Sequence, residues 1–315
     1  MAALAPWLSV TAPARAQAWP AKPLRIVVAF PPGGISDFAS RAIGPGLSEA
    51  LKQPVVIENR GGASGMIGTE IVTKSAPDGY TLLAHTVTFT VFPHMQPNPP
   101  IDPLRDLMPI TQIIDAPNIL VVTPSIPAKS VKDLVALASK RKGELSFASS
   151  GYGSGTHLSG ELFKYLAKLE MIHIAYKGGG PAVTDLLGGH VPMMFSTLPS
   201  VTSHIQAGRL RALAVTGAKR FPGAPNVPTM MEAGIPGYAF SGWSGLFAPA
   251  GTAREIVTRI ADETGKVLRS PGFREKLLIQ GAEPVGSSPD EFAAFVKSEY
   301  TRWGNLVKQS GIKAE

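Results

Sequence analysis

Short apolar, β-branched runs alternate with helical patterns along nearly the whole chain after Trp19, and this alternation constrains the fold most strongly. Strands that alternate with helices favour parallel sheets covered by helices. The strand-like runs are residues 24–30, 55–58, 81–85, 119–123, 145–148, 172–176, 191–195, 210–215 and 245–248. The sequence therefore predicts an α/β protein.

Amphipathic helical patterns lie between these runs. Residues 156–169 and 255–268 each place apolar side chains on one face at helical spacing. A helix is also expected after Asp37, with a kink or break at Pro45, because proline lacks a backbone N–H. A last helix, residues 289–308, begins at the start signal Ser288-Pro289-Asp290-Glu291.

The length and charge of the chain limit its organisation and partners. A chain of 315 residues is long for one hydrophobic core, so two domains are expected. No repeat, charge block or low-complexity linker divides the halves, which favours crossings on continuous strands. The net charge of +7 suits nucleic acid, but the basic residues are dispersed. Their longest cluster, Lys140-Arg141-Lys142, ends a helical pattern where cations favour the dipole, so no nucleic-acid partner is expected.

The N-terminus and the absence of cysteine bear on location and chemistry. Zero cysteines exclude disulfides, thiolate catalysis and cysteine metal sites. Residues 1–18 are rich in Ala, Pro and Leu and end in small residues at A-x-A spacing, which is typical of a signal peptide. The positive segment that normally precedes the apolar run is missing, so residues 1–18 are interpreted as a signal remnant of an exported protein.

A loop between the first strand and the first helix carries the clearest functional signal. It reads Pro31-Pro32-Gly33-Gly34, and Ser36 or Asp37 can cap the helix that follows. Free N–H groups and the positive end of a helix dipole suit an anion such as a carboxylate. The loop holds no Lys or Arg, so its donors would be backbone and hydroxyl groups. Asp37 could act as a base, but a helix-capping carboxylate is the favoured interpretation.

A second strand–loop–helix junction spans residues 148–157. Its glycines and hydroxyls again lie where N–H groups would be free, although a turn that serves geometry alone stays open. It is not a dinucleotide fingerprint, because Leu158 stands where the third glycine should fall. The glycine-rich segments at residues 176–181 and 61–65 are more typical of plain turns than of ligand-binding loops.

Signals for catalysis are poor. The chain has no G-x-S-x-G elbow and no phosphate-binding Walker loop, and its six histidines show no metal-binding spacing. His157 could line a cleft or be an ordinary histidine at a helix start. No catalytic set and no cofactor are predicted.

Seven motifs in register then indicate a family. They include Phe-Pro-Pro-Gly-Gly-x-x-Asp at residues 30–37, Pro-Asp-Gly-Tyr-Thr-Leu-Leu at 77–83 and Tyr-Lys-Gly-Gly-Gly-Pro at 176–181. With these motifs the chain closely resembles the Bug-type, or TctC, solute receptors of bacterial tripartite tricarboxylate transporters. The resemblance implies a two-lobe periplasmic binding protein, type II-like, with a mostly parallel sheet flanked by helices in each lobe. The ligand cleft lies between lobe 1 (residues 19–122 plus 245–315) and lobe 2 (123–244), with crossings near Val122 and Gly245.

The resemblance also implies the ligand site. In lobe 1 it consists of Pro32, Gly33, Gly34, Ile35, Ser36, Asp37, Phe38, His85, Thr86 and Thr88. In lobe 2 it consists of Ser149, Ser150, Gly151, Tyr152, Ser154, Gly155, Thr156, His157, Gly179, Ser196 and Thr197. His85 and Tyr152 depart from the small or polar residues expected there. Together with Ile35 and Phe38, Tyr152 favours a partly apolar or aromatic acid over citrate.

The function that follows from the resemblance is transport. Such receptors are periplasmic monomers without a cofactor that close like a hinge on a small organic acid, for example a dicarboxylate or an aromatic acid. They deliver it to a permease of one large and one small membrane subunit. Two alternatives stay open: a periplasmic sensor that docks on a signalling protein, and an enzyme that acts on a carboxylate.

Overall fold

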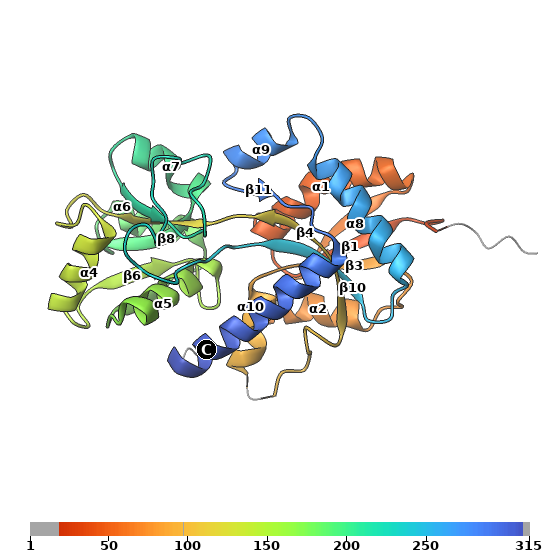
Figure 1. Ribbon diagram of the computed structural model, residues 1–315, viewed down its shortest axis with the longest axis horizontal. Coiled ribbons are helices and arrows are strands. Elements are labelled where there is room, and N and C mark those ends of the chain that lie inside the picture. Colours follow the sequence, from red (N-terminus) through yellow and green to blue (C-terminus); the bar gives the residue numbers. More distant parts are fainter. Residues whose placement is uncertain (1–18, 97, 311–315) are drawn as a thin grey trace, which may run out of the picture.

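Two sheets with flanking helices build the molecule. The structure is a computed structural model that describes residues 19–96 and 98–310. The two sheets lie side by side and define lobe 1 and lobe 2 (Figure 1). The signal remnant predicted at residues 1–18 lies outside the described residues.

The lobe 1 sheet has six strands in the order β11-β4-β10-β3-β1-β2. Its strands are β1 (Leu24–Val28), β2 (Val55–Asn59), β3 (Thr81–Thr86), β4 (Leu107–Asp115), β10 (Ser244–Pro249) and β11 (Glu283–Pro284). β1 is parallel to β2 and β3, whereas β10 is antiparallel to β3 and β4. The first three strands therefore end at the edge of the sheet where β10 begins.

Helices cover both faces of this sheet. They are α1 (Ile35–Leu51), η1 (Ala63–Gly65), α2 (Met66–Thr73), α3 (Thr88–Val91), η2 (Phe92–Met95), α8 (Arg254–Leu268), α9 (Phe273–Ile279) and α10 (Pro289–Ser310). Apolar residues of α1 and α8 pack together with those of β1 in one buried cluster, and residues of α2, α3 and α10 belong to another. The break expected at Pro45 is wrong, because α1 continues through it as one helix.

The lobe 2 sheet has five strands in the order β7-β6-β8-β5-β9. Its strands are β5 (Asn118–Val122), β6 (Ser146–Ser149), β7 (Ile172–Ala175), β8 (Met193–Thr197) and β9 (Arg211–Val215). Its helices are α4 (Val131–Lys140), α5 (Gly155–Ala167), α6 (Gly179–Leu187) and α7 (Leu198–Gln206). β6 is parallel to β7 and β8, and β5 is antiparallel to β8 and β9.

Two segments connect the lobes, and they run next to each other. The first leaves β4 at Asp115 and enters β5 at Asn118, and the second precedes β10. The N–H of Gly242 in the second donates to the Ala116 carbonyl in the first at 3.0 Å. The first crossing thus comes before Asn118, ahead of the predicted Val122, while the second lies beside the predicted Gly245.

The crossing strands also explain why both sheets are mixed, where mostly parallel sheets were predicted. β4, β5 and β10 adjoin the two crossings, and each of them pairs only antiparallel with its neighbours. The sequence analysis missed β4, which is nine residues long. Pro109 interrupts its apolar pattern, and proline normally argues against an interior strand.

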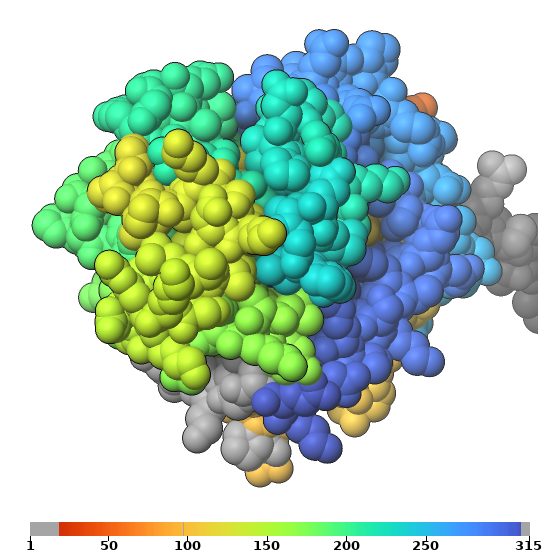
Figure 2. All heavy atoms as spheres, turned by 60° about the vertical axis from the view of Figure 1, so that its left-hand side comes forward, coloured from red at the N-terminus to blue at the C-terminus, as the bar shows by residue number. Residues whose placement is uncertain are grey.

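The C-terminal helix α10 packs along lobe 1 and against the second connecting segment. Figure 2 shows the segment after β9, in teal, packed beside α10, in blue. The Trp303 ring meets Phe240 edge-on at 5.7 Å between centroids, and the Arg302 guanidinium donates to the Ala239 carbonyl. Trp303 is fully buried, and its indole N–H donates to Glu299.

We expect the Trp303→Ala substitution to lower the free energy of unfolding by about 3–5 kcal/mol, because it removes a large buried ring and leaves a cavity. The measurement is urea unfolding followed by circular dichroism. Ile279→Ala is the control, since Ile279 is 76% exposed, and it should change stability by less than about 0.5 kcal/mol. Equal losses in the two variants would contradict this account of α10.

Candidate functional site

Strand direction places a cleft beside the connecting segments. In lobe 1, Ser244 at the start of β10 pairs with Thr86 at the end of β3. In lobe 2, Asn118 at the start of β5 pairs with Thr197 at the end of β8. The carboxyl ends of the parallel strands in both lobes therefore face the connecting segments. Open α/β sheets bind ligands outside these ends.

The Pro31–Gly34 loop reaches this region at the start of α1. Gly34 is the N-cap of α1 and supplies no side-chain cap, so Ser36 and Asp37, which were predicted to cap the helix, lie two and three positions past the cap, inside the first turn. The first N–H groups of a helix have no partner within the helix. Because Pro32 and Gly33 are exposed, this N-terminus can be reached by a ligand.

Asp37 holds the loop in shape. One carboxylate oxygen accepts the Gly33 N–H at 3.0 Å, and the other accepts Arg41 at 2.8 Å and the Asn59 amide at 2.9 Å. Burial alone would raise the pKa of Asp37, but these donors outweigh burial and hold the pKa below its ordinary value of 3.8. Asp37 therefore stabilises the conformation of the loop. Because both carboxylate oxygens already accept hydrogen bonds, they are poorly placed to take a proton from a substrate.

Other lobe 1 candidates lie around the start of β10. The Ser36 hydroxyl lies 3.4 Å from that of Ser244. The Thr86 hydroxyl donates a hydrogen bond to the Thr88 hydroxyl at 3.3 Å. Ile35 and Phe38 are half-buried and pack against the core cluster of α1 and α8.

His85 lies in the core beneath the loops. It is fully buried, with its ring 5.1 Å from those of Phe30 and Phe89. Its Nδ1 accepts the Thr86 N–H at 2.9 Å, and burial lowers the pKa of His85 to about 4. A side chain at Gly65 would come within 2.4 Å of its Nε2, so the imidazole sits directly under this turn. The structure therefore places His85 behind the wall of the cleft.

In lobe 2, a network of hydroxyls shapes the loop before α5. The Thr156 hydroxyl accepts the Ser150 N–H at 2.9 Å and lies within 3.0 Å of the hydroxyls of Ser150 and Ser154. Ser154 is the N-cap of α5 and accepts the His157 N–H at 3.2 Å. The predicted hydroxyls come together, and they fix the loop around Gly151.

Two stacked imidazoles support this loop from below. The rings of His157 and His173 lie 4.1 Å apart at 21°. His157 Nδ1 accepts the Gly153 N–H at 3.1 Å, and His173 Nε2 lies 2.6 Å from the Ser149 hydroxyl. His173 was not predicted as a site residue, although it lies in the strand predicted at residues 172–176.

Both imidazoles are neutral near neutral pH. Burial, followed by His173 and Lys164, lowers the pKa of His157 to about 3. Burial, followed by Lys164, lowers the pKa of His173 to about 4. An Nδ1 that accepts a hydrogen bond carries no proton, so the bond from Gly153 agrees with a neutral His157.

The remaining lobe 2 candidates follow β7 and β8. Gly179 is half-buried and begins α6, and the buried Ser196 lies in β8. Thr197 is exposed as the N-cap of α7, and its hydroxyl lies 2.8 Å from that of Ser200. These residues occupy the same edge of the lobe 2 sheet as the loop before α5.

The two lobes are in direct contact where the Thr88 hydroxyl of lobe 1 donates to the Gly153 carbonyl of lobe 2 at 3.3 Å. A cavity of about 270 Å³ lies at this contact. We call it the α3–η2 cavity; it is lined by Ala63, Ser64, Thr88, Val91, Phe92, Met95, Gln96, Tyr152 and Gly153. Both lobes therefore contribute to the wall of this cavity.

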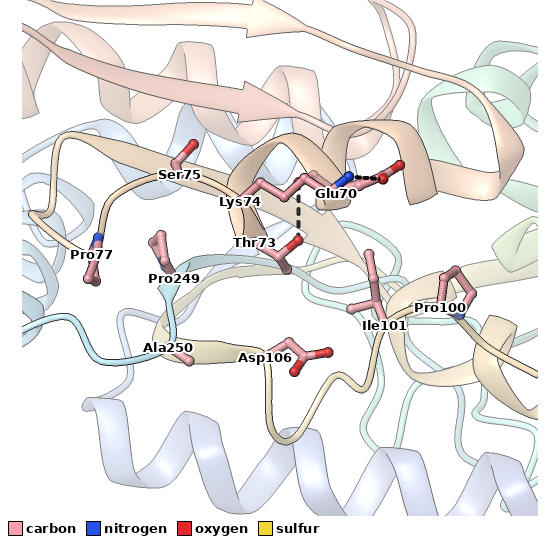
Figure 3. A pocket seen from close by; sticks show the side chains of 10 residues that line it. All are labelled: Glu70, Thr73, Lys74, Ser75, Pro77, Pro100, Ile101, Asp106, Pro249 and Ala250. Atoms are coloured by element: carbon pink, nitrogen blue, oxygen red, sulfur yellow. Dashed lines mark hydrogen bonds and ion pairs between the residues drawn. The ribbon is translucent and has the colours of Figure 1, made fainter.

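A larger cavity, of about 430 Å³, lies at the opposite end of the lobe 1 strands (Figure 3). Pro249 at the end of β10 lines it, and it contains none of the predicted ligand residues. Its charged groups have partners: Lys74 pairs with Glu70, and Asp106 pairs with Arg105. Paired charges leave little reason for an acid to bind there.

Within residues 19–96 and 98–310, no group of three or more His, Asp or Glu residues is placed to hold a metal ion. No helix in this part of the chain combines the length and apolar character needed to cross a bilayer.

The model of the tripartite tricarboxylate transporter family receptor, TctC, matches residues 39–312. The chain belongs to this family. Protein BugT of Bordetella pertussis is 40% identical to this receptor over 306 residues, which are 96% of this chain and 94% of BugT. The structure of the periplasmic binding protein BugD is 33% identical, with a TM-score of 0.79 over 94% of this chain and 100% of BugD.

Two further relatives of this TctC-family receptor were solved with ligands. An R. palustris protein with adipate is 39% identical, with a TM-score of 0.82 over 94% of this chain and 99% of that protein. MatC from Rhodopseudomonas palustris with bound malate is 29% identical, with a TM-score of 0.78 over 92% and 100%. The expected Bug-type receptor family and two-lobe periplasmic binding protein fold are confirmed.

We expect Asp37→Asn to lower the stability of the folded chain by about 1.5–3 kcal/mol at neutral pH, the range for hydrogen bonds to a charged group. A carboxyl whose folded-state pKa is lowered stabilises the fold above its unfolded pKa and loses that effect as pH falls through the folded value. The gap between wild type and variant should therefore shrink below the ordinary pKa of 3.8. Urea midpoints across this range measure it, and a constant gap would contradict it.

The buried histidines predict a loss of stability on acidification. The unfolded chain binds protons below the ordinary histidine pKa of 6.5, whereas folded His173 takes one up only near pH 4. Since the unfolded state binds more protons between these values, the free energy of unfolding decreases there as the pH is lowered. His173→Gln should flatten this dependence in urea unfolding from pH 6.5 downward. An unchanged slope would show that His173 is protonated in the folded chain.

Proposed function

We propose that this chain is a non-enzymatic periplasmic receptor that captures a small organic acid between its lobes. It works as a monomer without a cofactor and delivers the acid to the large and small membrane subunits of a tripartite tricarboxylate permease. The observation that carries the proposal is the N-terminus of α1, where Gly33 is exposed and the half-buried N-cap Gly34 supplies no side-chain cap. The adipate and malate bound to two relatives support a carboxylate ligand.

In this proposal the carboxylate is bound by backbone N–H groups and by the dipole of helix α1. The N–H groups of Ile35 and Ser36 lie in the first turn of α1, where the helix dipole favours a negative charge. Such donors must replace the water that the carboxylate loses, because an unpaired buried charge is costly. Asp37 does not oppose the ligand's charge, since Arg41 pairs with it.

Lobe 2 would hold the other end of the ligand. The loop at Ser150 and Gly151 lies at the matching edge of its sheet, and the Thr88–Gly153 bond joins the two lobes. A ligand that contacts both lobes stabilises the closed arrangement by its differential affinity for that arrangement. Hinge closure on an acid is therefore the proposed working motion.

Two alternatives differ in partner or chemistry. A periplasmic sensor would bind the same acid but dock on a signalling protein, and no contact in the structure favours it. An enzyme would need a free acid or base at the cleft. Asp37 is engaged in hydrogen bonds, and the His157 Nδ1 accepts one from the Gly153 N–H, so the enzyme alternative lacks support.

The direct test is thermal unfolding of residues 19–315, freed of retained ligand by refolding, with adipate, malate, citrate and benzoate. A ligand at a hundredfold excess over its Kd should stabilise the fold by about 2.7 kcal/mol. The double variant Ser150→Ala, Thr156→Ala should lose this gain, because the lobe 2 loop loses its hydroxyl network. Ser298→Ala, an exposed position on α10, should keep it. If none of these acids stabilises the ligand-free protein, the proposal is wrong.

Delivery to a permease needs its own experiment. Vesicles that contain the two permease subunits should accumulate the labelled acid only when the receptor is added. If the receptor binds the acid but uptake does not change, the sensor alternative is favoured.

A further inference from the structure

The α3–η2 cavity lies where lobe 1 and lobe 2 meet. Three contacts lead from its wall to the start of α1: the Thr88 hydroxyl lies 3.3 Å from that of Thr86, Thr86 pairs with Ser244, and the Ser244 hydroxyl lies 3.4 Å from that of Ser36. Thr88 and Tyr152, which the sequence analysis assigns to the ligand site, both line it. Gly153 of the lobe 2 loop also lines it, and the other residues of the wall lie in η1, in α3 after Thr88, and in or next to η2, outside the predicted ligand site. The cavity therefore extends the cleft toward a part of lobe 1 without a function so far.

The wall of this cavity is mainly apolar and carries no charge. Val91, Phe92 and Met95 supply apolar side chains, and Ser64 and Gln96 supply uncharged polar groups. None of the nine lining residues is ionisable near neutral pH. The apolar side chains of this wall suit a hydrocarbon group, whose transfer out of water is favourable.

Tyr152 forms an aromatic wall whose orientation is fixed. Its ring meets His173 at 82° and 4.9 Å, and His157 at 68° and 5.5 Å. The stacked imidazoles hold this ring in place while 44% of the tyrosine stays exposed. A prepositioned aromatic surface binds a flat or apolar group with little loss of conformational entropy.

The size of the cavity suits a ring. A cavity of about 150 Å³ in a protein core can bind benzene. The α3–η2 cavity measures about 270 Å³, so a six-membered ring fits with room to spare. Because both lobes form the wall, a ring in the cavity would also favour closure.

We propose that the preferred ligand of this receptor is an organic acid with a ring-sized apolar body, which occupies the α3–η2 cavity while its carboxylate binds at the start of α1. This inference rests on the proposed function and narrows its ligand class. It assigns specificity to Met95 and Tyr152, and it disfavours compact polyacids such as citrate.

Titration calorimetry with benzoate, cyclohexanecarboxylate, malate and citrate tests this assignment. The wild-type chain should bind the two ring acids at least about tenfold more tightly than malate or citrate, a difference of about 1.4 kcal/mol. Met95→Gln keeps the length of the side chain but makes it polar, and it should weaken ring-acid binding about tenfold. Met231→Gln is the matched control, since Met231 is 40% exposed and does not line the cavity, and it should bind like wild type.

The outcomes separate this inference from the proposed function. If malate or citrate binds and the ring acids do not, the receptor proposal stands and the ring-acid inference is wrong. Ring-acid binding that Met95→Gln leaves unchanged, in a variant with wild-type circular dichroism, also overturns it. If no acid binds to ligand-free protein, both proposals fail.

Discussion

The pair of connecting segments is the feature on which the rest of the arrangement depends. One passes through Ala116 and the other through Gly242, and a backbone hydrogen bond joins them. The first segment joins β4 of lobe 1 directly to β5 of lobe 2, and the second leads into β10 of lobe 1, so together they set the direction in which each sheet presents its strand ends. The carboxyl ends of the parallel strands therefore face a common space, and the loops that follow these strands can meet one ligand.

The loops in this space are shaped by internal hydrogen bonds that leave donors for a ligand. Asp37 ties the first loop to Gly33, and Thr156 ties the second loop to Ser150. Buried histidines support both lobes as neutral rings, because their Nδ1 atoms accept backbone N–H groups. These histidines therefore place no positive charge beside the loops, and the proposed recognition of an acid depends on oriented backbone dipoles.

Much of this architecture could be predicted from the sequence. Hydrophobic periodicity located nine of the strands, and the order of glycine-rich motifs indicated the family and the two lobes. The course of β4 escaped prediction because Pro109 breaks its pattern, and pairing direction is a property of the whole sheet. His85 was misplaced toward the cleft because a strand-end position does not reveal that the ring turns inward under Gly65. His173 was not predicted because it reaches the loop before α5 only through tertiary contacts.

A crystal structure of the receptor with a bound organic acid would locate the ligand. We expect a carboxylate within hydrogen-bond distance of the N–H groups of Ile35 and Ser36, with the ligand also in contact with the Ser150–Gly153 loop of lobe 2. A carboxylate bound instead by Lys74 in the cavity at the far end of the lobe 1 strands, with the cleft filled by water, would contradict this expectation.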